Sequence, residues 1–161
     1  MTLNSCLLGV DVANSAITSK RIILDANVLL TGLFVPQSKS REVILAVLRG
    51  ELAAYVVENT IEESEGAIVR AARRTGIDLT QSFRDGIRQI GVVTLPRVSR
   101  DEGRAYTKIQ RTGDKAIAAA AAKISADICT NDLSDFKQGD RYGLRVTTPQ
   151  HLIADNSIGL H

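Results

Sequence analysis

The chain has 161 residues, enough to bury one hydrophobic core and too few for two independent ones. Hydrophobic residues make up 44% and charged residues 24%. No apolar run approaches the roughly 18 residues that a membrane-spanning helix needs, so no membrane span is expected. Aromatic residues make up only 4% and tryptophan is absent, which argues against a surface that stacks successive nucleic-acid bases on aromatic rings. Any contact with a nucleic acid would therefore have to be mainly electrostatic, although the net charge is only +2.

Three segments with different expected roles divide the chain. Residues 1–20 have neither a basic start nor a long apolar stretch, so they do not resemble a signal peptide and form a leader of unclear role. Residues 21–154 carry the patterned elements of one domain, and residues 155–161 form a tail. The two cysteines, Cys6 and Cys129, are too few for a four-cysteine metal site, and Cys129 lies in an apolar run where a free buried thiol is usual. A reducing, cytoplasmic location is therefore favoured.

Five short apolar runs, rich in β-branched residues, are predicted to be strands. They lie at residues 22–24, 55–57, 92–95, 127–130 and 144–147. Nearly unbroken apolar runs, as opposed to alternating ones, are typical of strands that are buried on both faces of a parallel sheet. We therefore predict one five-stranded parallel sheet, with the strands at 22–24 and 127–130 adjacent and central.

Segments with helical spacing separate these runs. Helices are predicted at residues 41–49, 61–74, 80–90, 100–111, 114–124 and 150–154, and another could begin near Asn27. Ser40 is expected to cap the helix at 41–49 and Gly50 to end it. The alternation of strands and helices implies right-handed crossovers and a three-layer α/β/α sandwich. Open sheets of this kind bind ligands outside the carboxyl ends of their strands.

Four carboxylates fall at the ends of these predicted elements. They are Asp25 after the first strand, Glu63 near the start of the second predicted helix, Asp114 at the start of the alanine-rich helix, and Asp132 after the fourth strand. Each has a simpler explanation, because acidic residues are favoured at helix starts and in turns, and Thr60 with Glu63 has the spacing of a capping box. Capping does not require all four to share one edge of the sheet, whereas the predicted topology places them there.

Carboxylates gathered at one edge would need a cation, since like charges repel and cannot all stay ionised without compensation. Mg²⁺ and Mn²⁺ prefer oxygen ligands. The only histidines, His151 and His161, lie near the end of the chain, so no zinc site competes. Neither a Gly-x-x-x-x-Gly-Lys phosphate loop nor a Gly-x-Ser-x-Gly motif is present. We therefore predict Mg²⁺ or Mn²⁺ as the cofactor.

Several motifs resemble the PIN-domain family, including the VapC-like toxins of bacterial toxin–antitoxin pairs. They are ILDANVLL at 23–30, IEESE at 61–65, the alanine-rich helix followed by Thr130-Asn131-Asp132, Asp135-Phe136, and YGLRVTTP at 142–149. The likeness covers residues 21–154. The leader departs from the family, whose first strand usually begins near the start of the chain.

The resemblance implies a hydrolase that cleaves RNA phosphodiester bonds as a metal-dependent endoribonuclease. Asp25, Asp114 and Asp132 would hold the metal, with Glu63 helping directly or through water. The IEESE motif contains two further glutamates, Glu62 and Glu65, that compete for this role, and we favour Glu63.

Two neighbouring residues are auxiliary candidates. Asp135 could orient a metal-bound water or cap its turn, and Thr130 could position a ligand or be purely structural. Four basic residues could follow the RNA backbone or be ordinary surface charges: Lys39, Arg41, Arg111 and Lys115. The resemblance also implies frequent homodimers, for which the apolar helix face around residues 43–48 is a candidate surface, and an antitoxin protein as a possible partner.

Two other functions fit part of this pattern. An aspartate-nucleophile phosphatase also has an aspartate after its first strand, but it needs a second aspartate two positions later, where this chain has Asn27. A catalytically silent PIN-like scaffold that binds RNA or protein remains the alternative, and metal-dependent RNA cleavage separates it from a nuclease.

Overall fold

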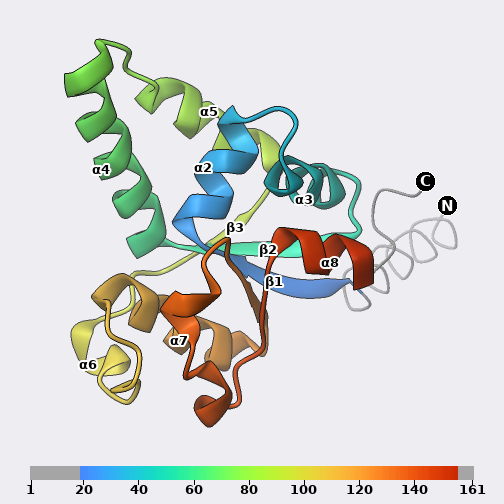
Figure 1. Cartoon of the computed structure of the whole chain (residues 1–161), viewed down its shortest axis with the longest axis vertical. Helices are drawn as coiled ribbons and strands as arrows, with labels where there is room; N and C mark the ends of the chain where they lie inside the picture. The colour runs from blue at the N-terminus through green and yellow to red at the C-terminus, as the bar shows by residue number, and fades with distance from the viewer. Residues whose placement is uncertain (1–18, 156–161) are drawn as a thin grey trace, which may run out of the picture.

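The computed structural model describes residues 19–155, and its five strands form one parallel sheet (Figure 1). The strands are β1 (Lys20–Leu24), β2 (Leu52–Val57), β3 (Val93–Leu95), β4 (Asp127–Cys129) and β5 (Val146–Thr147), in the order β3-β2-β1-β4-β5. All four pairings are parallel. The predicted sheet is confirmed, with β1 at its centre and β4 beside it. Most of the predicted leader (1–20) and tail (155–161) lies outside the described residues.

Helices connect these strands and cover both faces of the sheet. They are α2 (Ala26–Phe34), α3 (Lys39–Leu48), α4 (Glu58–Thr75), α5 (Thr80–Ile90), α6 (Arg100–Gly103), α7 (Thr112–Ile124) and α8 (Pro149–Asp155), with two short 3₁₀ helices, η1 (Leu133–Phe136) and η2 (Gly139–Tyr142). Within residues 19–155, none of them has both the length and the apolar character that crossing a bilayer would demand.

Two hydrophobic cores lie on the two faces of the sheet, because successive side chains of a strand point to opposite sides. Ile22 and Leu24 of β1 pack into the core under α2, α3, α5 and α8. Ile23, between them, packs into the other core with Ile117 and Ala118 of α7. Figure 1 shows α2, α3 and α8 on one side of β1 and β2, with α7 on the other. The predicted three-layer α/β/α sandwich is thus confirmed.

The start of α3 differs from the sequence prediction. Ser38, not Ser40, caps this helix, since its hydroxyl accepts a hydrogen bond from the Arg41 backbone N–H at 3.0 Å. Ser40 lies in the first turn, where it is 2% exposed, and its hydroxyl accepts from Asn131 Nδ2 at 3.2 Å. The correction links the start of α3 to the turn that follows β4.

The helix predicted at 100–111 is also shorter than expected, because α6 ends at Gly103. A tertiary contact explains the difference. The Lys108 backbone N–H donates to the Tyr142 hydroxyl at 2.9 Å, and the Tyr142 ring packs against the ring of Tyr106 with centroids 5.0 Å apart. These contacts hold the segment between α6 and α7 as a loop fixed to η2.

Gly32 allows α2 and α3 to cross closely. A Cβ at this position would lie 2.6 Å from Cγ1 of Ile44 and 3.0 Å from the carbonyl oxygen of Ser40. We expect Gly32→Ala to lower the free energy of unfolding by about 1–3 kcal/mol in urea denaturation, because the two helices must separate.

Gly66 of α4 is the matched control for this substitution. A Cβ there would contact only the flexible end of Arg70, at 3.4 Å. Gly66→Ala should raise stability by up to about 1 kcal/mol through helix propensity. Equal effects of both substitutions would contradict the close crossing as the reason for Gly32.

Candidate active site

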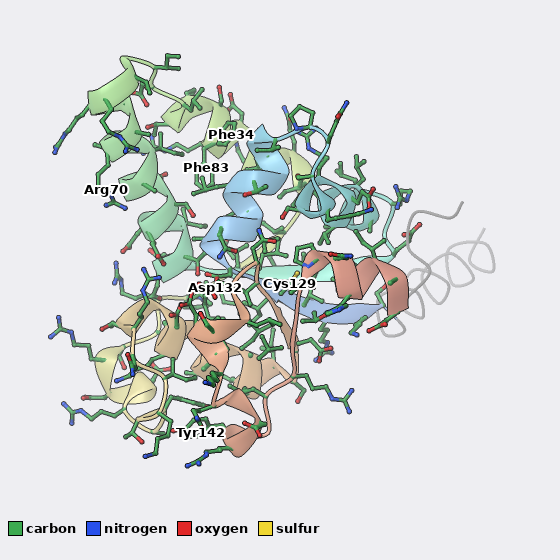
Figure 2. The ribbon with its side chains drawn as sticks, in the orientation of Figure 1. Phe34, Arg70, Phe83, Cys129, Asp132 and Tyr142 are labelled. Carbon is green, nitrogen blue, oxygen red and sulfur yellow. The ribbon has the colours of Figure 1, made fainter. Side chains whose placement is uncertain are left out.

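Three aspartates from different parts of the chain converge at the carboxyl edge of the sheet. Asp25 follows β1, Asp114 lies in the first turn of α7, and Asp135 lies in η1 after β4. One carboxylate oxygen of each lies within 4.8 Å of the other two. Asp25 and Asp114 are both only 4% exposed. We call Asp25, Asp114 and Asp135 the acidic group. Figure 2 labels Asp132 in this part of the molecule.

Asp25 has two structural tasks besides its place in the acidic group. Its Oδ1 accepts from the Ala26 backbone N–H at 2.7 Å and so caps α2. Its Oδ2 accepts from the Thr130 hydroxyl at 2.7 Å, across a sequence separation that only the β1–β4 pairing closes. Burial raises the pKa of Asp25, while the hydrogen bonds from Thr130 and Ala26 act in the opposite direction. Asp25 therefore both caps α2 and belongs to the acidic group, two roles that the sequence presents as alternatives.

Asp114 lacks the capping role that the sequence suggested for it. Helix α7 begins at Thr112, with Arg111 at the cap position and no side-chain capping bond. Asp114 Oδ2 is buried without a hydrogen-bond partner among the described residues. Burial, followed by repulsion from Asp25 and Asp135, raises the pKa of Asp114 to about 7. A buried, unpartnered carboxylate oxygen facing two other carboxylates matches the donor set that a hard divalent cation requires.

The capping box predicted for Glu63 and Thr60 does not form. Because α4 begins at Glu58, Thr60 lies inside the helix and does not cap it. Burial raises the pKa of Glu63, repulsion from Asp25 raises it further, and Arg111 lowers it. Gly113 leaves room for this side chain, since a Cβ there would lie 3.1 Å from Glu63 Oε2.

The two competing glutamates are engaged elsewhere. Glu62 pairs with Arg97, and Glu65 accepts from Arg84 Nε at 2.9 Å. Glu63, in contrast, lies close enough to Asp25 for repulsion from that carboxylate to raise its pKa. The geometry therefore brings Glu63 toward the acidic group.

Arg111 bridges the acids from the solvent side. Its Nη2 lies 3.4 Å from Glu63 Oε1, and its Nη1 lies 3.8 Å from Asp135 Oδ2. Its positive charge also lowers the pKa of Asp25, Glu63 and Asp114. The depression beside it has a volume of about 350 Å³ and is lined by Asp114, Asp135 and Arg111 together with Lys108 and Lys137.

Asp132 is not brought into the acidic group. It is exposed and caps η1, where it accepts from the Ser134 backbone N–H at 3.1 Å and from the Ser134 hydroxyl. Its own backbone N–H donates to the Thr130 hydroxyl at 3.1 Å. The Asp132 side chain is therefore bound to Ser134 within its own turn, and η1 places Asp135 in the acidic group. In the sequence, the signal that favours Asp135 is the apolar Phe136 beside it. Phe136 is 3% exposed and fixes η1 against the core.

The four basic candidates have different surroundings. Arg111 lies at the acids, as described, and Lys115 lies one residue beyond Asp114. Lys39 pairs with Glu42 at 3.2 Å. Arg41 donates to the carbonyl oxygens of Gly32 and Leu33, so it closes the end of α2.

Fold and site together define an α/β protein with a carboxylate-lined site at the carboxyl edge of a parallel sheet. Residues 23–152 match the family described as PIN domain. The chain belongs to the PIN-domain family, which confirms the resemblance seen in its motifs. Among curated proteins, no sequence matches the chain.

Three solved structures share the fold. PAE2754 from Pyrobaculum aerophilum is 14% identical with a TM-score of 0.64, covering 87% of this chain and 97% of that one. VapBC2 from Rickettsia felis, bound to a DNA fragment from their promoter, is 11% identical with a TM-score of 0.59, covering 80% and 98%. FitAcB from Neisseria gonorrhoeae is 22% identical with a TM-score of 0.54, covering 81% and 99%. The likeness to VapBC2 agrees with the VapC-like resemblance at the level of the fold.

Thr130 links the acidic group to the turn after β4, and it is fully buried. Thr130→Val keeps the shape but removes the hydrogen bonds to Asp25 and from Asp132. We expect the free energy of unfolding to fall by about 1–3 kcal/mol. The pKa of Asp25 should rise, because a bond to its charged form is lost. Carbon-detected NMR titration of the aspartate carboxyls measures this shift. An unchanged Asp25 titration would contradict the link.

Proposed function

We propose that the chain is a divalent-metal-dependent endoribonuclease that hydrolyses RNA phosphodiester bonds. The observation that carries the proposal is the convergence of Asp25, Asp114 and Asp135 within 4.8 Å, with Asp114 Oδ2 buried and without a hydrogen-bond partner in the described part of the chain. Membership of the PIN-domain family supports nuclease activity, and the oxygen-only donor set supports Mg²⁺ or Mn²⁺.

The residues divide into holding and orienting roles. Asp25, Asp114 and Asp135 would hold the metal, with Asp135 taking the place that the sequence assigned to Asp132. The Thr130 hydroxyl keeps the Asp25 carboxylate in orientation. When bound, a divalent cation supplies positive charge for the phosphate oxygens and makes water more acidic.

Glu63 and Arg111 would act at the open side of the acidic group. The raised pKa of Glu63 makes its carboxylate a better proton acceptor than an exposed glutamate, so it can take a proton at the oxygen that faces Gly113. Arg111, whose side chain is 64% exposed, offers its guanidinium to the non-bridging oxygens of a phosphate.

Metal-dependent cleavage tests the proposal. The purified chain is incubated with a fluorescent single-stranded RNA and Mg²⁺ or Mn²⁺, and the products are resolved on a denaturing gel. We expect cleavage that stops when a chelator is added. A silent scaffold would instead bind the RNA equally with and without metal and release no fragments, and that outcome would overturn the assignment.

We further propose that the nuclease is the toxin of a toxin–antitoxin pair and works in the cytoplasm with an antitoxin partner. The VapC-like resemblance and the shared fold of VapBC2 support this. Induced expression should arrest bacterial growth, and Asp114→Asn should restore it. Arrest that persists with Asp114→Asn would separate toxicity from the acidic group.

A homodimer is the expected assembly. Of the face proposed for contact, Val43, Ile44 and Val47 are used in the core, whereas Leu45 and Leu48 are 41% and 53% exposed. Sedimentation at micromolar concentration should show a dimer, and Leu48→Glu should shift it toward monomer if α3 forms the contact. A monomer in the parent chain would count against the dimer.

A further inference from the structure

A basic cavity lies beside the first turn of α7, where Thr112, Lys115 and Ala116 line it. Its volume is about 760 Å³, more than twice that of the depression at the acids. It opens between the loop before α6, the helix α6 itself and the start of α7. Four cationic side chains line it: Arg97, Arg100, Arg104 and Lys115.

Hydrogen bonds hold the wall of this cavity in place. Asn59 of α4 donates to the carbonyl of Val98 at 3.1 Å and accepts from the Val98 backbone N–H at 2.9 Å. Ser99 and Glu102 form a complete capping box at the start of α6. Gly103 packs directly on Lys115, whose Cβ would be only 3.3 Å from a Cβ at Gly103. Contacts within the fold therefore hold the backbone that forms the wall of the cavity.

Two of the four cations lack an acidic partner among the residues that the structure describes. Arg97 pairs with Glu62, and Arg104 pairs with Asp101 at 3.0 Å. Arg100 and Lys115 form no ion pair or side-chain hydrogen bond within residues 19–155. Unpaired cations that face one concave space attract an anion into it.

The cavity and the acidic group share two helices. Lys115 follows Asp114 on α7, so the two side chains point about 100° apart around the helix. Asn59 lies one turn before Glu63 on α4. The cavity and the depression at the acids are therefore lined by consecutive residues of α7, Lys115 and Asp114. A polymer with regularly spaced phosphates can reach both sites at once.

We propose that this cavity is a second binding subsite, in which Arg100 and Lys115 each contact a backbone phosphate of the RNA strand on one side of the bond to be cleaved. The proposal rests on the ribonuclease function proposed above. Arginine presents a planar fork of donors that fits phosphate oxygens, and such contacts position a strand without choosing its sequence. An acidic peptide is the competing occupant, and the test includes it.

Binding without metal tests the subsite separately from catalysis. A fluorescein-labelled single-stranded RNA is titrated with the full chain in chelator, and anisotropy is followed over a range of NaCl concentrations. Loss of two phosphate contacts in the double variant Arg100→Gln, Lys115→Gln should lower the slope of log Kd against log salt by about 1.4, and each single variant by about half of that. Affinity at about 0.1 M salt should fall about tenfold or more.

The control removes the same charge from another place. Arg73 and Arg74 are exposed in the last turn of α4, so Arg73→Gln with Arg74→Gln should change the slope little. Equal slopes for the two double variants would overturn the subsite. It would also be overturned if the double variant Arg100→Gln, Lys115→Gln lost binding to polyglutamate but kept its binding to RNA. If the parent chain does not cleave RNA with Mg²⁺ or Mn²⁺ but the two variants differ in RNA binding, the ribonuclease proposal fails and the subsite stands.

Discussion

Replacing Asp114 by asparagine should abolish metal-dependent RNA cleavage and leave the metal-free protein folded. The substitution keeps the shape of the side chain and removes the charge that faces Asp25 and Asp135. We expect cleavage to fall at least about 100-fold, because loss of a direct ligand should cost no less than loss of a residue that orients one. Calorimetric titration with Mn²⁺ should show a matching loss of metal affinity. Retained cleavage together with a loss of folding stability would make Asp114 a structural residue.

Asp135 and Asp132 provide a matched pair for the same experiment. Asp135→Asn removes a member of the acidic group and should lower cleavage as Asp114→Asn does. Asp132 caps η1, and asparagine caps as well as aspartate, so Asp132→Asn should be close to neutral in both stability and cleavage. The opposite ranking would assign the metal to Asp132, as the motif alone suggested.

The metal-free protein should lose stability as the pH rises through neutrality. The folded-state pKa of Asp114 is raised from 3.8 to about 7, and those of Asp25 and Glu63 are raised as well. Between these values the folded state binds more protons than the unfolded chain, so its extra stability is complete below about pH 4 and is lost as the pH passes 7. We expect the free energy of unfolding to fall by about 2 kcal/mol between pH 5 and pH 8, with partial exposure to solvent limiting the effect.

Urea denaturation in chelator across this range measures the loss. Asp114→Asn should flatten the dependence, because the group that titrates near pH 7 is gone, and should make the protein more stable than the parent at pH 8. Saturating Mn²⁺ should restore the stability of the parent chain at pH 8 and have little effect on the variant. A parent chain whose stability is unchanged from pH 5 to pH 8 would contradict the mutual repulsion of the acids.

The sheet could be predicted because its information is local. Unbroken apolar runs such as Ile22-Ile23-Leu24 indicate a strand buried on both faces, and alternation with helices then fixes the parallel topology. Contacts between distant residues were not predictable in this way. The Tyr142 hydroxyl ends the helix expected at 100–111, and the Asn131 side chain engages Ser40, which the sequence had suggested as a helix cap.

The sequence predicts the edge of the sheet at which the candidate site lies, but not the full set of residues that form it. Asp25, Glu63 and Asp114 could be placed by their positions after a strand or at helix starts. The choice between Asp132 and Asp135 depends on which way a short turn faces, and that direction is set by Thr130 and by the burial of Phe136. The assignment of Glu63 over its neighbours depended on Arg84 and Arg97, which bind Glu65 and Glu62 from other elements.

The acidic group joins Asp25, near the start of the described residues, to Asp114 and Asp135 in their last third, and this has a consequence for synthesis on the ribosome. Asp135 is the last of its members to leave the exit tunnel, and Thr130, which orients Asp25, leaves only shortly before it. A nascent chain that has exposed α2 and α4 therefore still lacks a complete site. Because domains fold as units, the proposed nuclease activity would begin only when translation of the domain is nearly finished.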